Sequence, residues 1–304
     1  MMIRFLKKII IFIIIGVIFL TLLLSYYGGY LDYFYEKFTT AKQYSFILGD
    51  SRAMQGIQPK VLDSCLQKSK YKLPTYNFSF TIAQIAYGPS YLSAIKRKLD
   101  TTVYNQLFIV SVNPWMLANR EPRLANESDA LFLKSPPHNM EIMNVSPNFE
   151  YIIKNFNYFH FKAVFRKNSK LHKDGWLEEN NLPTSKKIFE EWKANQILMF
   201  NSWVTKWEIS NFRIRWLSNS IAYLKKYGTV VLIRMPIDNE ILFVETAFWK
   251  DFDVDINKLS VQHDIVYFNF SGKNEWKTYD GHHLDKFGGK LFSVKLSEEI
   301  KKQL

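Results

Sequence analysis

Residues 107–112 read LFIVSV, an unbroken apolar run of the kind that forms a strand buried on both faces of a sheet. Residues 229–235, TVVLIRM, and residues 265–270, IVYFNF, have the same character. Two shorter candidate strands precede them, at residues 44–48 and 75–80. Five buried-type strands predict an α/β fold with a central parallel sheet, provided that helices separate them.

Helical patterns do fill the gaps between these runs. We predict helices at about residues 83–99, at about residues 194–226 with Gly228 as a stop, and from the N-cap Asp285 to the C-terminus. An insertion with weak periodicity occupies about residues 117–192. Because sites in parallel sheets form at the carboxyl ends of the strands, chemistry is expected directly after each run.

The N-terminal segment predicts a membrane anchor. Residues 9–31 carry no charge and would span about 34 Å as a helix, enough to cross the hydrocarbon. Arg4, Lys7 and Lys8 precede the run, which places residues 1–8 in the cytoplasm, and Tyr26 begins an aromatic belt. Residues 32–43 are expected to be a linker, and residues 44–304 a domain facing the periplasm or cell exterior.

A cleaved signal peptide is the alternative interpretation of this segment. Its apolar region should be about 7–15 residues long and end in small residues. Here the run is longer and ends in Ser25-Tyr26-Tyr27, which favours an uncleaved anchor. In either case the rest of the chain lies outside the cytoplasm.

Composition excludes several classes of protein. With 304 residues, 47% hydrophobic and 16% aromatic, the chain is not disordered. The single cysteine, Cys65, excludes an intramolecular disulfide and a multi-thiolate zinc site. The net charge is +12, or near +9 without the residues before the anchor. The charge suits anionic lipids or envelope polymers, or is simply a solvated surface; no nucleic-acid motif accompanies it.

Two short blocks carry the chemistry. The first strand is followed by Gly49-Asp50-Ser51, where a sharp turn can expose the serine hydroxyl and leave its backbone N–H free. Before the last helix lies Asp280-Gly281-His282-His283, in which a histidine can serve as base and an aspartate three residues earlier can orient it. Alone, the first block is more simply interpreted as a turn, and the second as an ordinary polar loop before a helix.

Together the two blocks resemble the SGNH/GDSL hydrolase superfamily. The resemblance implies a three-layer, flavodoxin-like fold with Ser51 as nucleophile, His283 as base and Asp280 as orienting acid, His282 being a flanking residue. It also implies an oxyanion hole made by Ser51, by Ser79 in place of the usual glycine, and by Asn113 after the third strand. No metal or organic cofactor is implied.

Within the superfamily, the sequence looks closest to membrane-anchored proteins of alginate O-acetylation and of teichoic-acid D-alanyl transfer. The anchor, the Ser79 block and Arg234-Met235-Pro236 suggest this branch. The implied activity is a serine esterase acting on acyl esters, O-acetyl esters above all, of a cell-envelope glycan or polymer. The alternatives are an acyltransferase partner of a multi-spanning membrane acyltransferase, and a catalytically silent glycan-binding or scaffold protein.

Three further residues are candidates for substrate contact. Arg52 and Arg234 could hold an anionic group, and Trp115 could stack on a sugar ring, although ion pairs and core packing explain them equally well. The remaining histidines lack metal-ligand spacing: His138, His160, His172 and His263.

Overall fold

In the computed structural model, described for residues 2–123, 127–156, 168–273 and 275–303, a central sheet of five parallel strands forms the core. The order is β2-β1-β3-β8-β9, which is the flavodoxin-like order 2-1-3-4-5 when only these strands are counted. The predicted α/β fold is therefore confirmed. The five strands are β1 (Phe46–Leu48), β2 (Tyr76–Asn77), β3 (Gln106–Ser111), β8 (Gly228–Arg234) and β9 (Val266–Asn269).

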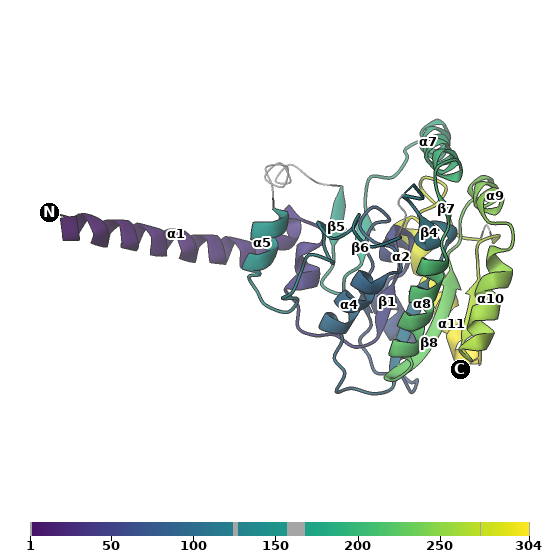
Figure 1. Cartoon of the computed structure of the whole chain (residues 1–304), viewed down its shortest axis with the longest axis horizontal. Helices are drawn as coiled ribbons and strands as arrows, with labels where there is room; N and C mark the ends of the chain where they lie inside the picture. Colours follow the sequence, from purple (N-terminus) through teal and green to yellow (C-terminus); the bar gives the residue numbers. More distant parts are fainter. Residues whose placement is uncertain (1, 124–126, 157–167, 274, 304) are drawn as a thin grey trace.

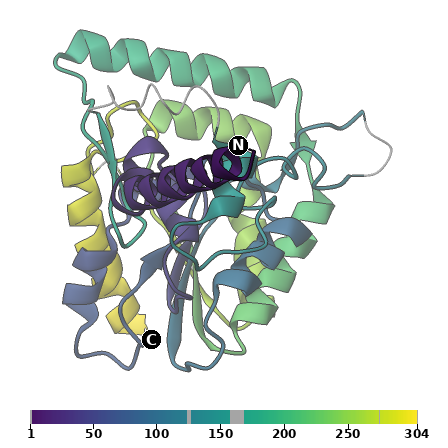
Figure 2. The ribbon, with the colours of Figure 1, turned by 90° about the vertical axis from the view of Figure 1, so that its left-hand side faces the viewer.

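Helices cover both faces of this sheet, as Figure 2 shows. On one face Phe46, Phe108 and Leu232 pack against helices α4, α8 and α10. On the other face Ile47 and Ile109 pack against helices α2, α3 and α11. These helices are α2 (Ser51–Gly56), α3 (Pro59–Leu66), α4 (Pro89–Lys98), α8 (Asn211–Leu224), α10 (Phe252–Gln262) and α11 (Lys286–Gln303). Alternate side chains of each strand thus supply two separate cores.

The segment between β3 and β8 holds further small elements and one long helix. They are η2 (Pro114–Leu117), β4 (Ala118–Asn119), α5 (Phe149–Asn155), β5 (Ser169–Leu171), β6 (Leu177–Glu179), α7 (Lys186–Val204) and β7 (Glu208–Ile209). The strands β5 and β6 form one antiparallel pair, and β4 and β7 form another. Helix α7 runs across the top of the molecule in Figure 2, and α9 (Asn239–Phe248) lies beside it.

The single helix predicted at 194–226 is wrong, because the chain forms α7 and α8 with a break between them. Ser210 ends the break: its hydroxyl accepts a hydrogen bond from the N–H of Arg213 and caps α8. The backbone of Ser210 also donates to Leu117 O at 3.0 Å, next to the β4–β7 pair. The helix predicted at 83–99 starts later, at Pro89, where proline occupies the first turn.

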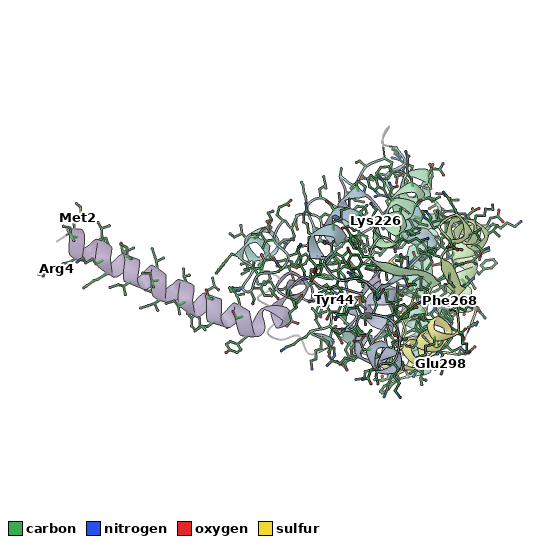
Figure 3. All side chains as sticks on the ribbon, turned by 90° about the horizontal axis from the view of Figure 1, so that it is seen from below. Met2, Arg4, Tyr44, Lys226, Phe268 and Glu298 are labelled. Carbon is green, nitrogen blue, oxygen red and sulfur yellow. The ribbon has the colours of Figure 1, made fainter. Side chains whose placement is uncertain are left out.

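The N-terminal segment forms helix α1 (Met2–Leu31). Within the described residues, one helix is long and apolar enough to cross a membrane, Met2–Tyr26, with a mean hydropathy of 3.0. Most of its side chains stand free of the domain (Figure 3), and the helix fits either a single-pass anchor or a signal sequence.

Residues 32–43, which were expected to be a linker, pack against the domain. They contain the short helix η1 (Tyr35–Phe38), and Tyr35 and Phe38 are buried in the core cluster beside α4. Lys37 is also buried, and its ammonium group donates to the carbonyls of Asn77 and Gly175. Burial lowers the pKa of Lys37 to about 7. The segment therefore belongs to the folded domain.

Candidate active site

Ser51 lies at the carboxyl end of β1, beside the point where the strand order reverses between β1 and β3. Gly49 makes the turn with φ +144°, and a Cβ there would lie 2.7 Å from the Cβ of Ser111. The side chain of Asp50 caps α2 by accepting from the N–H of Arg52. Ser51 is thus the first residue of α2, where backbone N–H groups have no intrahelical acceptor.

His283 and Asp280 lie in the loop between β9 and α11. One carboxylate oxygen of Asp280 accepts from the backbone N–H groups of His282 and His283, at 3.1 and 2.9 Å, which folds the loop tightly. Gly281 takes the left-handed conformation that this turn requires, with φ +90°. As predicted, Asp285 caps α11, because its carboxylate accepts from Phe287 and Gly288.

The two loops bring three side chains into one hydrogen-bonded row. His283 Nε2 lies 2.8 Å from Ser51 Oγ, and His283 Nδ1 lies 2.8 Å from Asp280 Oδ2. With the proton on Nδ1, the imidazole donates to the carboxylate and accepts the serine hydroxyl. All three residues are at most 9% exposed. This is the arrangement of a serine nucleophile, a general base and an orienting acid.

Neighbouring groups stabilise the negative charge of the Asp280 carboxylate. Burial alone raises the pKa of this carboxyl group, but attraction to His283 and His282 and hydrogen bonds from His283 outweigh burial. The resulting pKa lies below its ordinary value. Asp280 is therefore a carboxylate at neutral pH, able to stabilise an imidazolium on His283.

Asn113 is held beside the nucleophile. Its amide nitrogen donates to Asp50 Oδ2 at 2.7 Å, and its amide oxygen accepts from the N–H of Met116, which caps η2. An amide nitrogen carries two hydrogens, so one remains after the bond to Asp50. The geometry leaves Asn113 and the N–H of Ser51 as candidate oxyanion donors.

Ser79 is placed differently from the prediction. Its backbone N–H, expected to point into the oxyanion hole, donates instead to the side-chain oxygen of Asn77 at 3.2 Å. Its hydroxyl donates to Ile47 O, and the residue is completely buried. The amide of Asn77 in turn donates to the carbonyls of Ala53 and Ile57 at the end of α2. Ser79 therefore supports the nucleophile loop and has no free donor.

The two candidate arginines bind the same buried carboxylate. Arg52 Nη2 lies 2.7 Å from Glu245 Oε1, and Arg234 Nη2 lies 2.7 Å from Glu245 Oε2. Arg234 also pairs with Asp253 at 2.7 Å. Both arginines are 2% exposed and Glu245 is fully buried. The prediction that Arg52 and Arg234 bind an anionic group of the substrate is therefore wrong, because both belong to an internal ion-pair network.

Trp115 is also corrected, from a substrate platform to a core residue. It is 1% exposed, and its ring stacks on Phe200 and on Phe248, with centroid distances of 5.3 and 4.9 Å. Trp203 and Trp207 meet it edge-on. No face of the indole is left for a sugar.

His282 is a site residue that the sequence reasoning set aside. Its ring lies 3.7 Å from that of His283, centroid to centroid, and it is buried. His282 Nδ1 faces Arg52 Nε and His282 Nε2 faces Asp280 Oδ2, each at 3.5 Å. Burial and the neighbouring His283 hold the pKa of His282 well below its ordinary value. A neutral His282 therefore links Asp280 to Arg52.

Among the described residues, one group of side chains offers a set of possible metal ligands. Asp280, His282 and His283 each present a ligand atom, all within 4.8 Å of one another. The same atoms of Asp280 and His283 already bond to each other and to Ser51. Of the other histidines, His138, His172 and His263 each contact a separate partner, and His160 lies outside the described residues.

A pocket of about 280 Å³ adjoins the triad at Asp280. Tyr279 lines it, and its ring is stacked on His283 at 5.5 Å and touched edge-on by Trp192 of α7. The remaining lining is polar: Glu179, Asn181, Asn195 and Gln196. Residues at the end of β6 and on α7 therefore form one wall of a pocket next to the loop that carries Asp280.

No family model and no curated protein matches this sequence. Among solved structures, an aryl esterase of M. smegmatis aligns with a TM-score of 0.37 and 10% identity, over 86% of this chain and 100% of that chain. A carbohydrate acetylesterase family member from Sinorhizobium meliloti aligns with a TM-score of 0.36 and 10% identity, over 85% and 98%. Likeness at this level assigns neither a family nor a function, so the function depends on the site itself.

Proposed function

We propose that this chain is an exported, membrane-anchored serine esterase or acyltransferase of the SGNH/GDSL type. One observation carries the proposal: His283 bonds Ser51 Oγ through one ring nitrogen and Asp280 through the other, both at 2.8 Å. The sheet order supports it, because Ser51 and Asn113 follow the two strands that flank the reversal of order. A purely structural network would not need a serine hydroxyl at one ring nitrogen of the histidine and a carboxylate at the other.

The geometry supports the following acylation step. Ser51 Oγ attacks the ester carbonyl while its proton passes to His283 Nε2. The carbonyl oxygen becomes an oxyanion, held by the N–H of Ser51 and the remaining amide hydrogen of Asn113. Collapse breaks the bond to the alcohol, which takes the proton from His283 as it leaves. Each such donor contributes about 10²–10³-fold in rate.

The acyl-enzyme is then released by a second attack. His283 takes a proton from water or from a sugar hydroxyl as that oxygen attacks the acyl carbonyl. Collapse then breaks the bond between the acyl carbon and Ser51 Oγ, which takes the proton from His283. Water as acceptor gives an esterase, and a hydroxyl gives an acyltransferase; the row of residues is the same. No metal or organic cofactor enters these steps.

We propose that an acylated envelope glycan occupies the pocket beside Asp280. Sugar rings pack on aromatic side chains such as Trp192 and Tyr279, and their hydroxyls pair with amides and carboxylates. Asn181, Asn195 and Gln196 supply the amides. We propose an O-acetyl ester as the bond attacked. A multi-spanning acyltransferase is the partner that would load Ser51 if transfer is the reaction.

The orientation follows from the N-terminal helix. Arg4, Lys7 and Lys8 precede the apolar span and hold that end in the cytoplasm, so the catalytic domain faces the periplasm or cell exterior. The substrate is then a polymer of the envelope, reached from the membrane surface.

The test uses the full chain in detergent with an O-acetylated glycan, alone and with a deacetylated oligosaccharide as acceptor. Released acetate is measured by an enzymatic assay, and transferred acetate by mass spectrometry of the oligosaccharide. The proposal predicts release or transfer that disappears in Ser51→Ala. A folded protein that binds the glycan, yet releases and transfers nothing, would show instead a silent binding or scaffold protein.

A further inference from the structure

A group of exposed apolar side chains surrounds helix α5. Phe149 and Ile153 are 44% and 83% exposed and lie four residues apart, on the same face of the helix. Ile142 and Val145, in the preceding loop, are 47% and 49% exposed. The N–H of Ile142 donates to Glu150 at 2.7 Å, which ties the loop to the first turn of α5. These four residues are called the α5 patch.

The α5 patch lies next to the point where the chain leaves α1. Tyr151, on the opposite face of α5, is fully buried, and its hydroxyl donates to Asp32 at 2.8 Å. Asp32 is the residue directly after α1. The N–H of Asn148 donates to the hydroxyl of Tyr35 in η1. Figure 1 shows α5 beside the junction of α1 with the domain.

The domain also reaches back along the apolar helix. Leu24 is 3% exposed, whereas Leu22 and Leu23 are 54% and 38% exposed. A hydrocarbon layer of about 30 Å takes about 20 helical residues, so a span that begins at Ile9 ends near Gly28. Leu24 then lies about one helical turn inside the hydrocarbon. Helix α1 contacts η1 and β5, and Leu24 is buried, so we infer that part of the domain lies at the level of the lipid headgroups when α1 spans the bilayer.

We propose that the α5 patch rests in the headgroup layer of the outer leaflet and forms a second membrane contact beside α1. The chemistry of the patch favours apolar contact with lipid over attraction to anionic lipid. Lys154 Nζ lies 2.6 Å from Glu150 Oε1, one helical turn away. The cation on α5 is therefore already paired and does not need an anionic lipid headgroup. Phe149 and Ile153 are of the type that inserts shallowly into a bilayer surface.

The consequence is a fixed orientation of the catalytic domain. A domain that is attached through one helix alone can rotate relative to the bilayer, whereas a second contact fixes its tilt. The triad would then meet its polymer substrate from a constant direction and height above the bilayer. This inference rests on α1 remaining as an uncleaved anchor, which is part of the proposed function.

The experiment measures the depth of spin labels in the full chain, reconstituted in phosphatidylcholine vesicles. Single cysteines replace Ile153, Val261 and Val17 in a Cys65→Ser background, and each receives a nitroxide. Val261, 72% exposed on α10 at the opposite side of the domain, is the matched control, and Val17 reports on α1. Collision rates with oxygen, which enriches in lipid, and with a water-soluble nickel complex give the depth.

The proposal predicts that the ratio of oxygen to nickel collisions at residue 153 lies between the high ratio at residue 17 and the low ratio at residue 261. A lipid-exposed label at 17 with a water-exposed label at 153 would overturn the docking and leave the anchor intact. A label at 153 shielded from both reagents, or broadened by a second spin, would show a protein partner or a second copy instead. A water-exposed label at 17 would overturn the anchor itself.

Discussion

Arg52 and Glu245 form a buried ion pair directly behind the nucleophile, with 2.7 Å between Nη2 and Oε1. Arg52 follows Ser51 in the chain and faces His282, which in turn faces Asp280. The arginine therefore connects the loop of the nucleophile with the loop of the base. Arg234 also pairs with Glu245, so this buried carboxylate contacts two buried guanidinium groups, and Asp253 is a second partner of Arg234.

Removal of this carboxylate should destabilise the fold strongly. Glu245→Ala leaves Arg52 and Arg234 without their shared partner in a buried site, and a buried charge stripped of its partner costs about 3–5 kcal/mol. The free energy of unfolding, measured by urea titration of the full chain in detergent, checks this. Lys258→Ala is the control, because the Lys258–Asp255 pair is exposed and should contribute nothing measurable. Equal effects of the two variants would contradict the account.

His282 should make the fold sensitive to mild acid. Its folded pKa lies well below the unfolded value, so its contribution is complete above about pH 6.5 and is lost as the pH falls below that value. At pH 5.5, one unit below the unfolded pKa, the free energy of unfolding is lower by about 1.4 kcal/mol. In urea titrations at pH 7.5 and 5.5, His282→Gln should lose less stability between the two pH values than the wild type. The same loss in both proteins would show that His282 is already protonated in the fold.

Asn113 should matter for the rate and Ser79 should not. Asn113→Ala removes the amide donor and should lower kcat for p-nitrophenyl acetate by about 10²–10³-fold, with KM little changed, if the amide holds the oxyanion. Ser79→Ala keeps its backbone N–H bonded to Asn77 and should keep most of the activity. Circular dichroism verifies that both variants fold, since Asn113 also caps η2. A loss of activity smaller than about threefold in a folded Asn113→Ala would remove Asn113 from the oxyanion hole.

Trp115 should contribute to stability alone. Trp115→Ala opens a cavity between Phe200 and Phe248 and should cost about 3–5 kcal/mol in unfolding free energy. Trp115→Phe refills most of the space and should recover much of the loss. If the tryptophan contacted substrate, KM for the glycan would rise in the stable Trp115→Phe variant. An unchanged KM is expected.

The central strands could be predicted from sequence because a strand that is buried on both faces needs an unbroken apolar run, as in β3 and most of β8. All five runs became neighbouring strands, at 46–48, 76–77, 106–111, 228–234 and 266–269. The rule that sites form at the carboxyl ends of parallel strands then identified Ser51 and Asn113 as candidate site residues. The helix break before Ser210 escaped prediction, because Trp203 and Trp207 continue the apolar pattern through it. The pairing of β7 with β4 that holds this break is a long-range contact.

The surroundings of the site were harder to predict than the row Ser51–His283–Asp280. Arg52 and Glu245 lie far apart in sequence, and no spacing rule links them. The side chain of Asn77 accepts from the N–H of Ser79 and donates to the carbonyls of Ala53 and Ile57, which are contacts that only the folded chain shows. The spacing of His282 from Asp280 predicts only a flanking residue, whereas the pair of adjacent histidines before a helix is the one sequence signal that His282 belongs to the site. The α5 patch lies in an insertion without clear periodicity.

The central claim is that His283 activates Ser51, and a fluorophosphonate probe tests it most directly. The probe forms a covalent bond with activated serines, and mass spectrometry locates the adduct. The account predicts labelling of the full chain at Ser51, lost in Ser51→Ala and in His283→Ala, and retained in the buried control Ser79→Ala. A well-folded wild type that takes up no probe, or a Ser51→Ala variant labelled as strongly as the wild type, would contradict it.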